Sequence, residues 1–594
     1  MVKLDIVSIF LCATAFSGCA SQSAQLSPPA KPAPEAASGY TEKTGVVAKK
    51  FMIASANPLA TDAGYQMLKA GGSAIDAAIA AQMVLTLVEP QSSGIGGGGF
   101  LMLFDGVSMK AYDGRETAPS AATEKLFLDT GGKPLAFHDG VVGGRAVGAP
   151  GVLRMLELAH RQHGKLPWSA LFGPAIKQAD DGFVVSPRLA GLLKSELYLK
   201  RDPTAAAYFY DGDGSPWSAG HLLKNPALAA VLRDIAAGGA DAFYTGRVAR
   251  NIVAKVQGHP TNPGGLTLAD LAGYQAKVRD PVCSDYRAWT VCGMPPPSSG
   301  GIAIAQMLGM LEARTMSAYA PRDGVPDAEG VHLFAEAGRL AFADRARYVA
   351  DTDFVPLPGG SVKPLLDQRY LAARGALITE KSMGVAPSGQ PPATKLAQGL
   401  DTSPEFNSTS HLSVVDAQGQ SVAMTTSIED QFGARQMVDG FLLNNQLTDF
   451  SFDAADATGP VANRVQGGKR ARSAMSPTFV FEKSGRKLML SAGSPGGSAI
   501  INYVGKVMVG MMDWGLDIQQ AISLPNFGSR NGPTELEQDR VPDALVDALK
   551  AKGHSVRLMA QTSGLQGIMR MTVHGEDVWF GGADPRREGT VKGD

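Results

Sequence analysis

Three neighbouring hydroxyl side chains, Ser408, Thr409 and Ser410, lie about two-thirds of the way along this 594-residue chain. They stand directly before the run HLSVVD, which predicts a buried strand, and a second strand-like run, SVAMTT, follows after a short turn. A hydroxyl oxygen becomes a nucleophile only when a base takes its proton, and apart from one His no base is obvious nearby. The cluster is therefore either an ordinary loop end or a catalytic centre that obtains its base in another way.

A cut in the chain between Ser408 and Thr409 would supply that base. It would give Thr409 a free α-amino group, whose pKa of about 7.7–8.0 suits proton transfer near neutral pH. Such a cut is itself an attack by the Thr409 hydroxyl on the preceding carbonyl. The stretch GLDTSPEFNS before the cut reads as a loop, and the following strand would hold the new terminus rigidly.

Other motifs that resemble catalytic signatures are interpreted as structural. The glycines of Gly94–Gly99 match G-x-G-x-x-G, but a helix precedes them and a strand follows, which is the reverse of a dinucleotide site. They are expected to allow close approach of backbones. Ser484–Lys487 and Lys43–Gly45 match S-x-x-K and K-T-G, but in the wrong order. His160 and His163 have no third ligand at a suitable spacing, so no metal site is predicted.

The elements that must position the hydroxyl cluster occur in long blocks. Helical patterns dominate up to about residue 400 and strands dominate from His411 onward, without regular β-α alternation. This arrangement predicts an α+β fold in which helices cover antiparallel sheets. The apolar segment 74–88, capped by Ser73 and Asp76, is expected to be a buried core helix because it is too short to span a membrane.

The N-terminus predicts export. Lys3 precedes an apolar run at 6–16, and Phe16-Ser17-Gly18-Cys19 resembles a bacterial lipoprotein box in which Cys19 would carry the lipid. Residues 1–19 are then a signal peptide and residues 20–45 a Pro/Ala/Ser tether. Ala20 favours the outer membrane, so a periplasmic, lipid-anchored protein is expected, with ordinary export and cleavage as the alternative.

The composition of the chain limits the classes of partner that it is expected to bind. The formal net charge of −1 provides no long-range field for nucleic acid or acidic membranes, so contact with a membrane is expected only through the lipid. Cys283 and Cys292 bracket a short strand-like stretch, and in an oxidising compartment they are expected to form a disulfide. Two free buried thiols are the alternative.

Several ordered motifs together resemble the γ-glutamyltranspeptidase (glutathione hydrolase) family. They include TSHLSVVD, LLNNQLTDFS, SAMSPT and GSPGGS after the proposed cut, and VEPQSSGIGGGGF, YDGRETAP, MPPPSSGGI and ADPR elsewhere. The likeness extends over nearly the whole chain from about Val46. It implies a four-layer αββα sandwich of the N-terminal-nucleophile hydrolase type, cut into a large subunit, 46–408, and a small catalytic subunit, 409–594.

The resemblance also implies roles for individual residues and no metal or organic cofactor. Thr409 would cut the chain after Ser408 and then carry the acyl group, with Ser427 bonded to it. The remaining roles are backbone N–H donors of an oxyanion hole at Gly496 and Gly497, contacts to a substrate α-carboxylate from Arg115 and Ser473, and contacts to its α-ammonium from Glu429, Gln446 and Asp449.

This chain departs from the family pattern in the pocket. Glu429 stands where many members carry Asn, Ala474 replaces the second Ser of a pair, and the lid region 451–468 is short. The expected activity is hydrolysis of γ-glutamyl amides such as glutathione, or transfer to an amine acceptor, through a Thr409 ester. An acylase for glutaryl or cephalosporin side chains is the alternative within the family, and a non-catalytic periplasmic binding lipoprotein is the alternative outside the enzyme class.

Overall fold

The computed structural model describes residues 1, 39–394, 398–403, 408–484 and 487–594. The chain divides into two units, Met1–Ala30 and Lys31–Asp594, and only Met1 of the first unit is described. The predicted signal, Cys19 and most of the tether therefore lie outside the described residues, as do the two central residues of the S-x-x-K match. No helix in the described ranges is long and apolar enough to cross a membrane.

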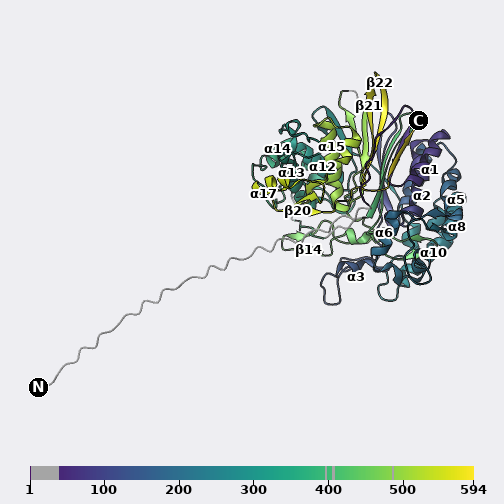
Figure 1. Ribbon diagram of the computed structural model, residues 1–594. Helices are drawn as coiled ribbons and strands as arrows, with labels where there is room; N and C mark the ends of the chain where they lie inside the picture. Colours follow the sequence, from purple (N-terminus) through teal and green to yellow (C-terminus); the bar gives the residue numbers. More distant parts are fainter. Residues whose placement is uncertain (2–38, 395–397, 404–407, 485–486) are drawn as a thin grey trace. The chain divides into compact units, whose positions relative to one another are not determined.

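Two seven-stranded sheets form the centre of the second unit (Figure 1). The first sheet has the order β1 (Val46–Ala48), β22 (Glu576–Ala583), β21 (Gln566–Val573), β17 (Leu488–Gly493), β16 (Thr478–Glu482), β9 (Trp289–Gly293), β8 (Val282–Tyr286). The second has the order β23 (Thr590–Gly593), β2 (Met52–Ser55), β10 (Ser408–Val415), β11 (Ser421–Glu429), β3 (Gly98–Phe104), β4 (Met109–Gly114), β7 (Lys277–Arg279).

The two sheets pack face to face, and helices cover both outer faces (Figure 1). Strands β10 and β11 contact β17 of the other sheet. The second sheet is covered by α1 (Pro58–Lys69), α2 (Ala74–Val88), α4 (Val152–His163), α5 (Gly173–Asp181), α8 (Pro226–Gly238) and α10 (Gly246–Gln257). The first is covered by α12 (Gly300–Leu311), α13 (Ala328–Tyr348), α14 (Gln368–Gly375), α15 (Ile500–Met512), α16 (Ile518–Ser523) and α17 (Asp543–Ala551). The predicted α+β, four-layer αββα architecture is confirmed.

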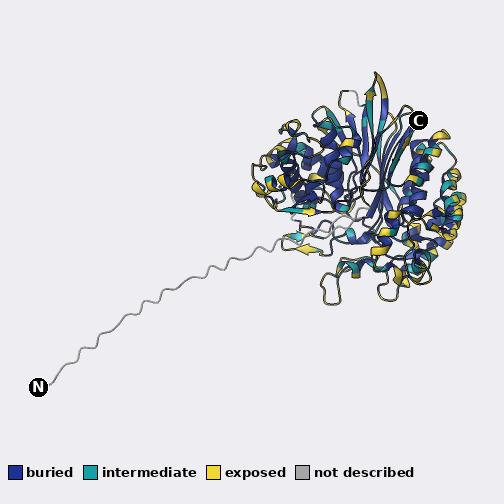
Figure 2. Ribbon diagram, viewed as in Figure 1, coloured by how far each residue is buried: buried dark blue, intermediate teal, exposed yellow. Residues whose placement is uncertain are grey.

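The central strands β10, β11 and β3 are buried on both faces, which explains their largely apolar runs (Figure 2). Successive side chains of a strand point to opposite faces. In β3, Phe100 and Met102 belong to the core between the sheets, whereas Leu101 and Leu103 belong to the core under the helices. Helix α2 is buried along its whole length and begins with the predicted capping box of Ser73. Its role as a core helix is confirmed.

The hairpin of β10 and β11 lies in the middle of the second sheet. Strand β10 also pairs with β2, and β11 also pairs with β3, so strands from the first half of the chain flank the hairpin on both sides. The glycine cluster permits this contact: a Cβ on Gly97 would lie 2.1 Å from the carbonyl oxygen of Ser427. The close approach predicted for these glycines is therefore observed.

The edge of the first sheet carries a disulfide. Cys283 of β8 and Cys292 of β9 lie directly opposite each other in the antiparallel pair, with their Sγ atoms 2.13 Å apart. The bond joins the two strands of the β8–β9 hairpin, which is the pairing expected from the sequence.

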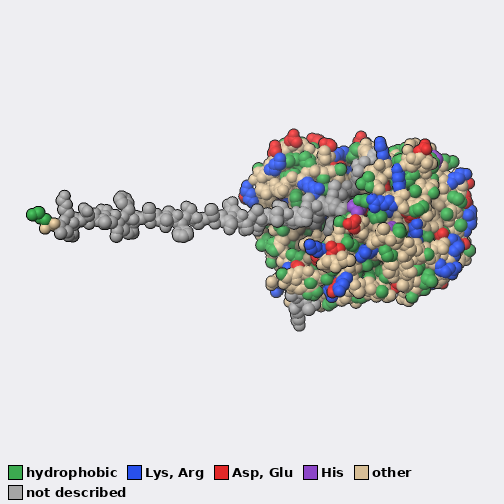
Figure 3. Space-filling view, turned by 90° about the horizontal axis from the view of Figure 1, so that it is seen from below, with side chains coloured by type: hydrophobic (Ala, Val, Ile, Leu, Met, Phe, Trp, Pro, Cys, Tyr) green, Lys and Arg blue, Asp and Glu red, His purple; other side chains and the backbone are tan. Residues whose placement is uncertain are grey.

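Charged side chains of both signs are mixed over the face of the molecule shown in Figure 3. This mixing agrees with the formal net charge of −1. The described residues visible on that face form no stripe of one sign of the kind that binds a nucleic-acid backbone.

Candidate active site

The peptide bond between Ser408 and Thr409 lies at an irregularity of the central hairpin. Thr409 pairs with Ser427 of β11, whereas Ser408 pairs with Glu429, so the register shifts between them. Glu429 also has a positive φ of 81°. Such a bulge and an unfavourable backbone conformation are typical of functional sites, where neighbouring structure holds the chain in place.

The hydroxyl groups of this hairpin form a short chain of hydrogen bonds. Thr409 Oγ1 donates to Ser427 Oγ at 3.4 Å, and Ser427 Oγ donates to the Ser408 carbonyl oxygen at 2.6 Å. The Glu429 N–H donates to Ser427 Oγ at 2.8 Å. Ser427 thus contacts both the hydroxyl and the carbonyl that a cut after Ser408 would involve.

The other two hydroxyls and the neighbouring His have separate partners. Ser408 Oγ donates to the Gln91 carbonyl oxygen, and Ser93 Oγ donates to Ser410 Oγ at 3.1 Å. His411 is fully buried, its ring nitrogens lie against hydroxyls of β10 and β11, and burial lowers its pKa to about 3. His411 therefore does not serve as the base for Thr409.

One pocket collects the residues that the sequence singled out. It is lined by Arg115, Thr409, Ser427, Glu429, Gln446, Asp449, Ser473, Ala474, Met475, Gly497 and Ile500. Of the residues predicted for catalysis and substrate binding, Gly496 does not line it, but Gly496 is the neighbour of Gly497; Ser408, predicted to precede the cut, does not line it either. Met475 and Ile500 were not predicted, because an apolar residue in a lining position has no motif of its own.

A buried cation forms one wall of this pocket. Arg115 follows β4 and is fully buried. Its guanidinium donates to the carbonyl oxygens of Ala471 and Arg472, each at 3.1 Å, and forms an ion pair with the Asp449 carboxylate. These bonds fix a planar donor group that suits a carboxylate ligand.

Acceptor groups line the pocket beside this cation. A short 3₁₀ helix, η6 (Gln446–Asp449), places its first and last side chains on one side, and Gln446 Nε2 donates to Asp449 Oδ2 at 2.9 Å. Asn445 Nδ2 donates to Glu429 Oε2 at 2.5 Å. The second oxygen of Glu429 and the amide oxygen of Gln446 are buried without a hydrogen-bond partner among the described residues. Buried acceptors usually have a hydrogen-bond partner in native proteins, so these two oxygens are available to a water or ligand donor that enters the pocket.

The protonation of Glu429 depends on this environment. Burial raises the pKa of its carboxyl well above the usual range, and the nearby carboxylates of Asp449 and Asp430 raise it further. In the empty pocket Glu429 is therefore held in its neutral form over a wider pH range than an exposed glutamate. A cation in the pocket would favour its ionised form.

Two loops complete the pocket. Ser473 is held by the MPPPSSGG turn, since its N–H donates to the Pro297 carbonyl oxygen at 2.9 Å and its own carbonyl accepts from Ser299. Gly496 and Gly497 precede α15 and have φ values of 133° and 53°. A Cβ on Gly496 would lie 2.6 Å from the Tyr503 ring, so only glycine fits there.

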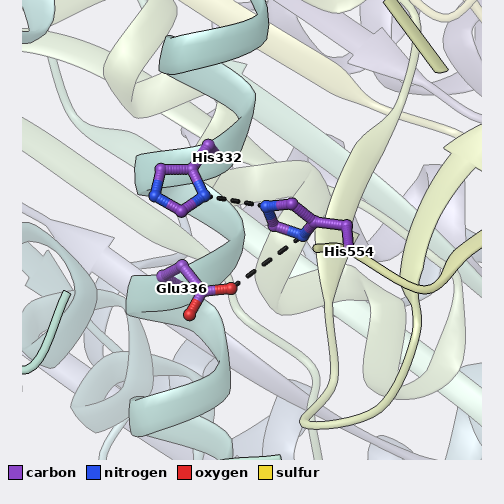
Figure 4. A group of neighbouring side chains, drawn as sticks. All are labelled: His332, Glu336 and His554. Carbon is purple, nitrogen blue, oxygen red and sulfur yellow. Dashed lines mark hydrogen bonds and ion pairs between the residues drawn. The ribbon is translucent and has the colours of Figure 1, made fainter. Parts of the chain in front are cut away.

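A second polar cluster consists of residues that do not line this pocket (Figure 4). His332, Glu336 and His554 are buried, with His332 Nδ1 2.7 Å from His554 Nε2. His332 Nε2 lies 2.7 Å from the Thr379 carbonyl oxygen, and Arg339 Nε donates to Glu336 Oε1 at 2.8 Å. The arrangement satisfies these atoms without an ion, and the adjacent guanidinium disfavours a cation. We interpret the cluster as a structural hydrogen-bond network.

Comparison with known proteins places the chain in a family. The sequence profile described as Gamma-glutamyltranspeptidase matches residues 60–594. The chain belongs to this family. It is 36% identical over 560 residues to the glutathione hydrolase proenzyme of Bacillus subtilis (strain 168), with 92% of each chain covered. The resemblance drawn from the motifs is thereby confirmed.

Acylases are also among the relatives. The chain is 35% identical over 569 residues to the acylase ACY 1 proenzyme of Pseudomonas sp. (strain SE83), covering 94% of this chain and 96% of that one. The crystal structure of cephalosporin acylase from Bacillus halodurans superposes with a TM-score of 0.79 at 26% identity, covering 96% and 99%. The chain is thus an enzyme of the gamma-glutamyltranspeptidase family with the N-terminal-nucleophile hydrolase fold.

One contact at the nucleophile strand was not predicted. Arg587 Nη1 donates to the Thr409 carbonyl oxygen at 3.3 Å. The ADPR run before it was noted as a family block, but nothing in its sequence indicates that the following Arg reaches the hairpin.

Proposed function

We propose that this protein is a self-processing γ-glutamyl hydrolase and transferase that cleaves γ-glutamyl amides such as glutathione. One observation carries the proposal: the Thr409 hydroxyl shares a small pocket with a buried guanidinium and with acidic and amide acceptors. A γ-glutamyl group presents an α-carboxylate and an α-ammonium on one carbon. The pocket offers matching charges within reach of a hydroxyl.

The first reaction is the cut of the chain. Thr409 Oγ1 attacks the Ser408 carbonyl carbon, and the Ser408–Thr409 peptide bond breaks as an ester forms on Thr409 and its amine takes the proton. Water then hydrolyses the ester to leave the Ser408 carboxylate and a free Thr409 hydroxyl. The 2.6 Å bond from Ser427 Oγ to the Ser408 oxygen supports this step, because it lies where negative charge develops.

The second reaction uses the new terminus. The Thr409 amine takes the hydroxyl proton, and Oγ1 attacks the γ-carbonyl of the substrate. The N–H groups of Gly496 and Gly497 stabilise the oxyanion, and the departing amine receives the proton. The resulting γ-glutamyl ester on Thr409 is resolved by water or by the amine of an amino acid or peptide.

Two sets of side chains in the pocket recognise the two charged groups of the substrate. Arg115 and Ser473 bind the α-carboxylate, and Glu429, Gln446 and Asp449 bind the α-ammonium. The two buried oxygens of Glu429 and Gln446 that lack donors support this assignment, because an ammonium group supplies three. In the absence of substrate, Arg115 and Asp449 neutralise each other.

The location of the enzyme and its subunits belong to the same proposal. We infer that residues 46–408 become the large subunit and residues 409–594 the small one. The Cys19 box supports export to the periplasm and attachment to the outer membrane through a lipid, with the tether of residues 20–45 between lipid and enzyme.

A glutaryl- or cephalosporin-type acylase is the second candidate. Its support is the 35% identity to the ACY 1 proenzyme and the superposition on cephalosporin acylase. A glutaryl group lacks the α-ammonium, so it would leave the oxygens of Glu429 and Gln446 unpaired. The unpaired acceptors therefore favour the γ-glutamyl group.

The pH dependence of specificity tests this choice. We expect the ratio of kcat/KM for γ-glutamyl p-nitroanilide to that for glutaryl p-nitroanilide to exceed one and to rise about tenfold from the acidic to the alkaline end of the enzyme's working pH range. Below its raised pKa Glu429 is neutral, and as the pH rises it ionises and attracts the substrate ammonium. Both substrates need the free Thr409 amine, so its titration cancels in the ratio.

The matched control is Glu429→Gln, which keeps the size and one acceptor of the side chain but cannot ionise. It should flatten the ratio over the same pH range while chain cutting continues. A wild-type ratio below one would favour the acylase, and a rising ratio that survives in Glu429→Gln would exclude Glu429 as its cause.

A further inference from the structure

The turn that follows α2 contacts the residue before the cut from outside the hairpin. Helix α2 ends at Val88, and the next residue, Glu89, is its C-cap and is 2% exposed. The N–H groups of Ser92 and Ser93 donate to the Glu89 carbonyl oxygen at 2.9 and 3.2 Å, so residues 89–93 form a compact turn. None of these five residues, all of them described, lines the active-site pocket. Neither reaction proposed above uses their side chains.

The Glu89 carboxylate holds this turn together. Its Oε2 accepts from Gln91 Nε2 at 2.8 Å and from Ser92 Oγ at 3.1 Å. Arg188 of α6 (Pro187–Ser195) places its Nε 3.8 Å from the same oxygen, and the side chains of Glu89 and Arg188 are 2% and 1% exposed. A buried carboxylate with a cation and two donors around it favours one geometry of the turn, because other geometries would leave buried polar groups unpaired.

The backbone of the turn binds the residue on the leaving side of the cut. The Gln91 carbonyl oxygen accepts from Ser408 Oγ and also from the Phe432 N–H, the latter at 3.1 Å. The Ser408 carbonyl oxygen accepts from Ser427 Oγ at 2.6 Å. Ser408 is therefore held at two points in the uncut chain, by the hairpin at its carbonyl and by the turn at its hydroxyl.

We propose that Glu89 is a positioning residue for self-cutting, which holds Ser408 still through the Gln91 carbonyl while the Thr409 hydroxyl attacks. The inference rests on the proposed self-cutting and adds to it a group outside the pocket. Attack requires the hydroxyl oxygen to approach the carbonyl carbon in one orientation, so a less restrained Ser408 reaches that orientation less often. Once the bond is broken, Ser408 is no longer joined to Thr409. Glu89 should therefore affect the cut more than later turnover.

The test is Glu89→Met, which keeps the length of the side chain but removes the acceptor. The full chain is pulse-labelled in cells that export it, and denaturing gels follow the loss of the uncut band. We expect the first-order rate of cutting to fall about tenfold. In the fully cut enzyme, kcat and KM for γ-glutamyl p-nitroanilide should change less than about threefold. Glu89→Gln retains an acceptor oxygen for both donors and should cut within about threefold of the wild-type rate.

Ser93→Ala is the matched control. It alters the same turn, but the Ser93 hydroxyl donates to Ser410, on the other side of the cut, and not to the residues that Glu89 binds. It should leave the cutting rate within about twofold of wild type. If Glu89→Met does not fold, Gln91→Met replaces it, because this change removes the amide that Glu89 binds and leaves Glu89 beside Arg188. It should slow the cut in the same direction.

Ser408→Ala tests the route of the effect. It removes the hydroxyl that the Gln91 carbonyl binds, so it should slow the cut by itself. Adding Glu89→Met to Ser408→Ala should then lower the rate by less than about threefold, because two changes that act through one contact are not additive. A further tenfold fall in that background would show that Glu89 does not act through Ser408 and would overturn the proposal.

The remaining outcomes separate this inference from the proposed function. A Glu89→Met chain that cuts at the wild-type rate overturns the role of Glu89, while a wild type that cuts itself and releases nitroaniline upholds the proposed function. Equal slowing in Ser93→Ala or Glu89→Gln, or an equal loss of kcat/KM in the cut Glu89→Met enzyme, indicates a general distortion and overturns the positioning role. A wild type that neither cuts itself nor releases nitroaniline overturns both.

Discussion

Replacing Thr409 by Ala leaves the protein as one uncut chain and lowers the release of nitroaniline from γ-glutamyl p-nitroanilide by more than about 10⁴-fold. The change removes the oxygen that attacks the Ser408 carbonyl, and with it the hydroxyl that would carry the acyl group. Because the chain is not cut, the α-amino base is not released either. Denaturing gel electrophoresis after long incubation, followed by the anilide assay, measures both effects.

Two neighbouring changes serve as controls for that result. Thr409→Ser keeps a hydroxyl at the same atom and should still cut itself, although more slowly. Ser410→Ala removes a hydroxyl whose described partner is Ser93 and should cut like the wild type. If the Thr409→Ala protein splits into two pieces, or the Ser410→Ala protein remains whole, the assignment of Thr409 as the nucleophile is wrong.

Replacing Arg115 by Leu has the second largest expected effect, a fall of about 10²- to 10³-fold in kcat/KM for γ-glutamyl p-nitroanilide. The loss follows from removing the charged donors that bind the substrate α-carboxylate. It should appear mainly as a higher KM, because the carboxylate is bound in the ground state as well as in the transition state. Initial-rate kinetics on the cut enzyme measure it.

Arg115→Lys separates charge from geometry. It keeps a cation but loses the planar pair of donors, so we expect it to recover only part of the lost kcat/KM. Self-cutting should continue in both variants, because the hydrogen bonds at Ser408, Thr409 and Ser427 do not include Arg115. If Arg115→Leu binds the γ-glutamyl substrate as well as the wild type does, Arg115 does not bind the substrate α-carboxylate.

The sequence predicted the site residues well where they belong to short motifs of consecutive residues. The hydroxyl cluster and the absence of a suitable base pointed to Thr409, and the resemblance to the family, carried by runs such as NNQLTDF, named the other residues that line one pocket. Relations between distant segments could not be predicted. That Ser427 contacts the Ser408 carbonyl depends on the register shift of the hairpin, and the ion pair of Glu89 with Arg188 joins residues with no shared pattern.

The fold was predictable at the level of layers but not of strand order. The blocks of helix and strand patterns indicated α+β layering, and the apolar segment 74–88 indicated a core helix. The sheet orders bring β2 and β3 to either side of β10 and β11 across more than 300 residues of sequence. Pairing over such separations depends on the tertiary packing of both faces of the sheet, which local patterns do not encode.

The central claim is that Thr409, as the new N-terminal residue, carries the γ-glutamyl group during turnover. Rapid acid quenching of the cut enzyme with a γ-glutamyl donor, followed by peptide mass spectrometry of the small subunit, tests it directly. The account predicts a peptide that begins at Thr409 and is heavier by one γ-glutamyl group on that residue. A γ-glutamyl group on another residue, or product formation by a protein whose Ser408–Thr409 bond is intact, would contradict the account.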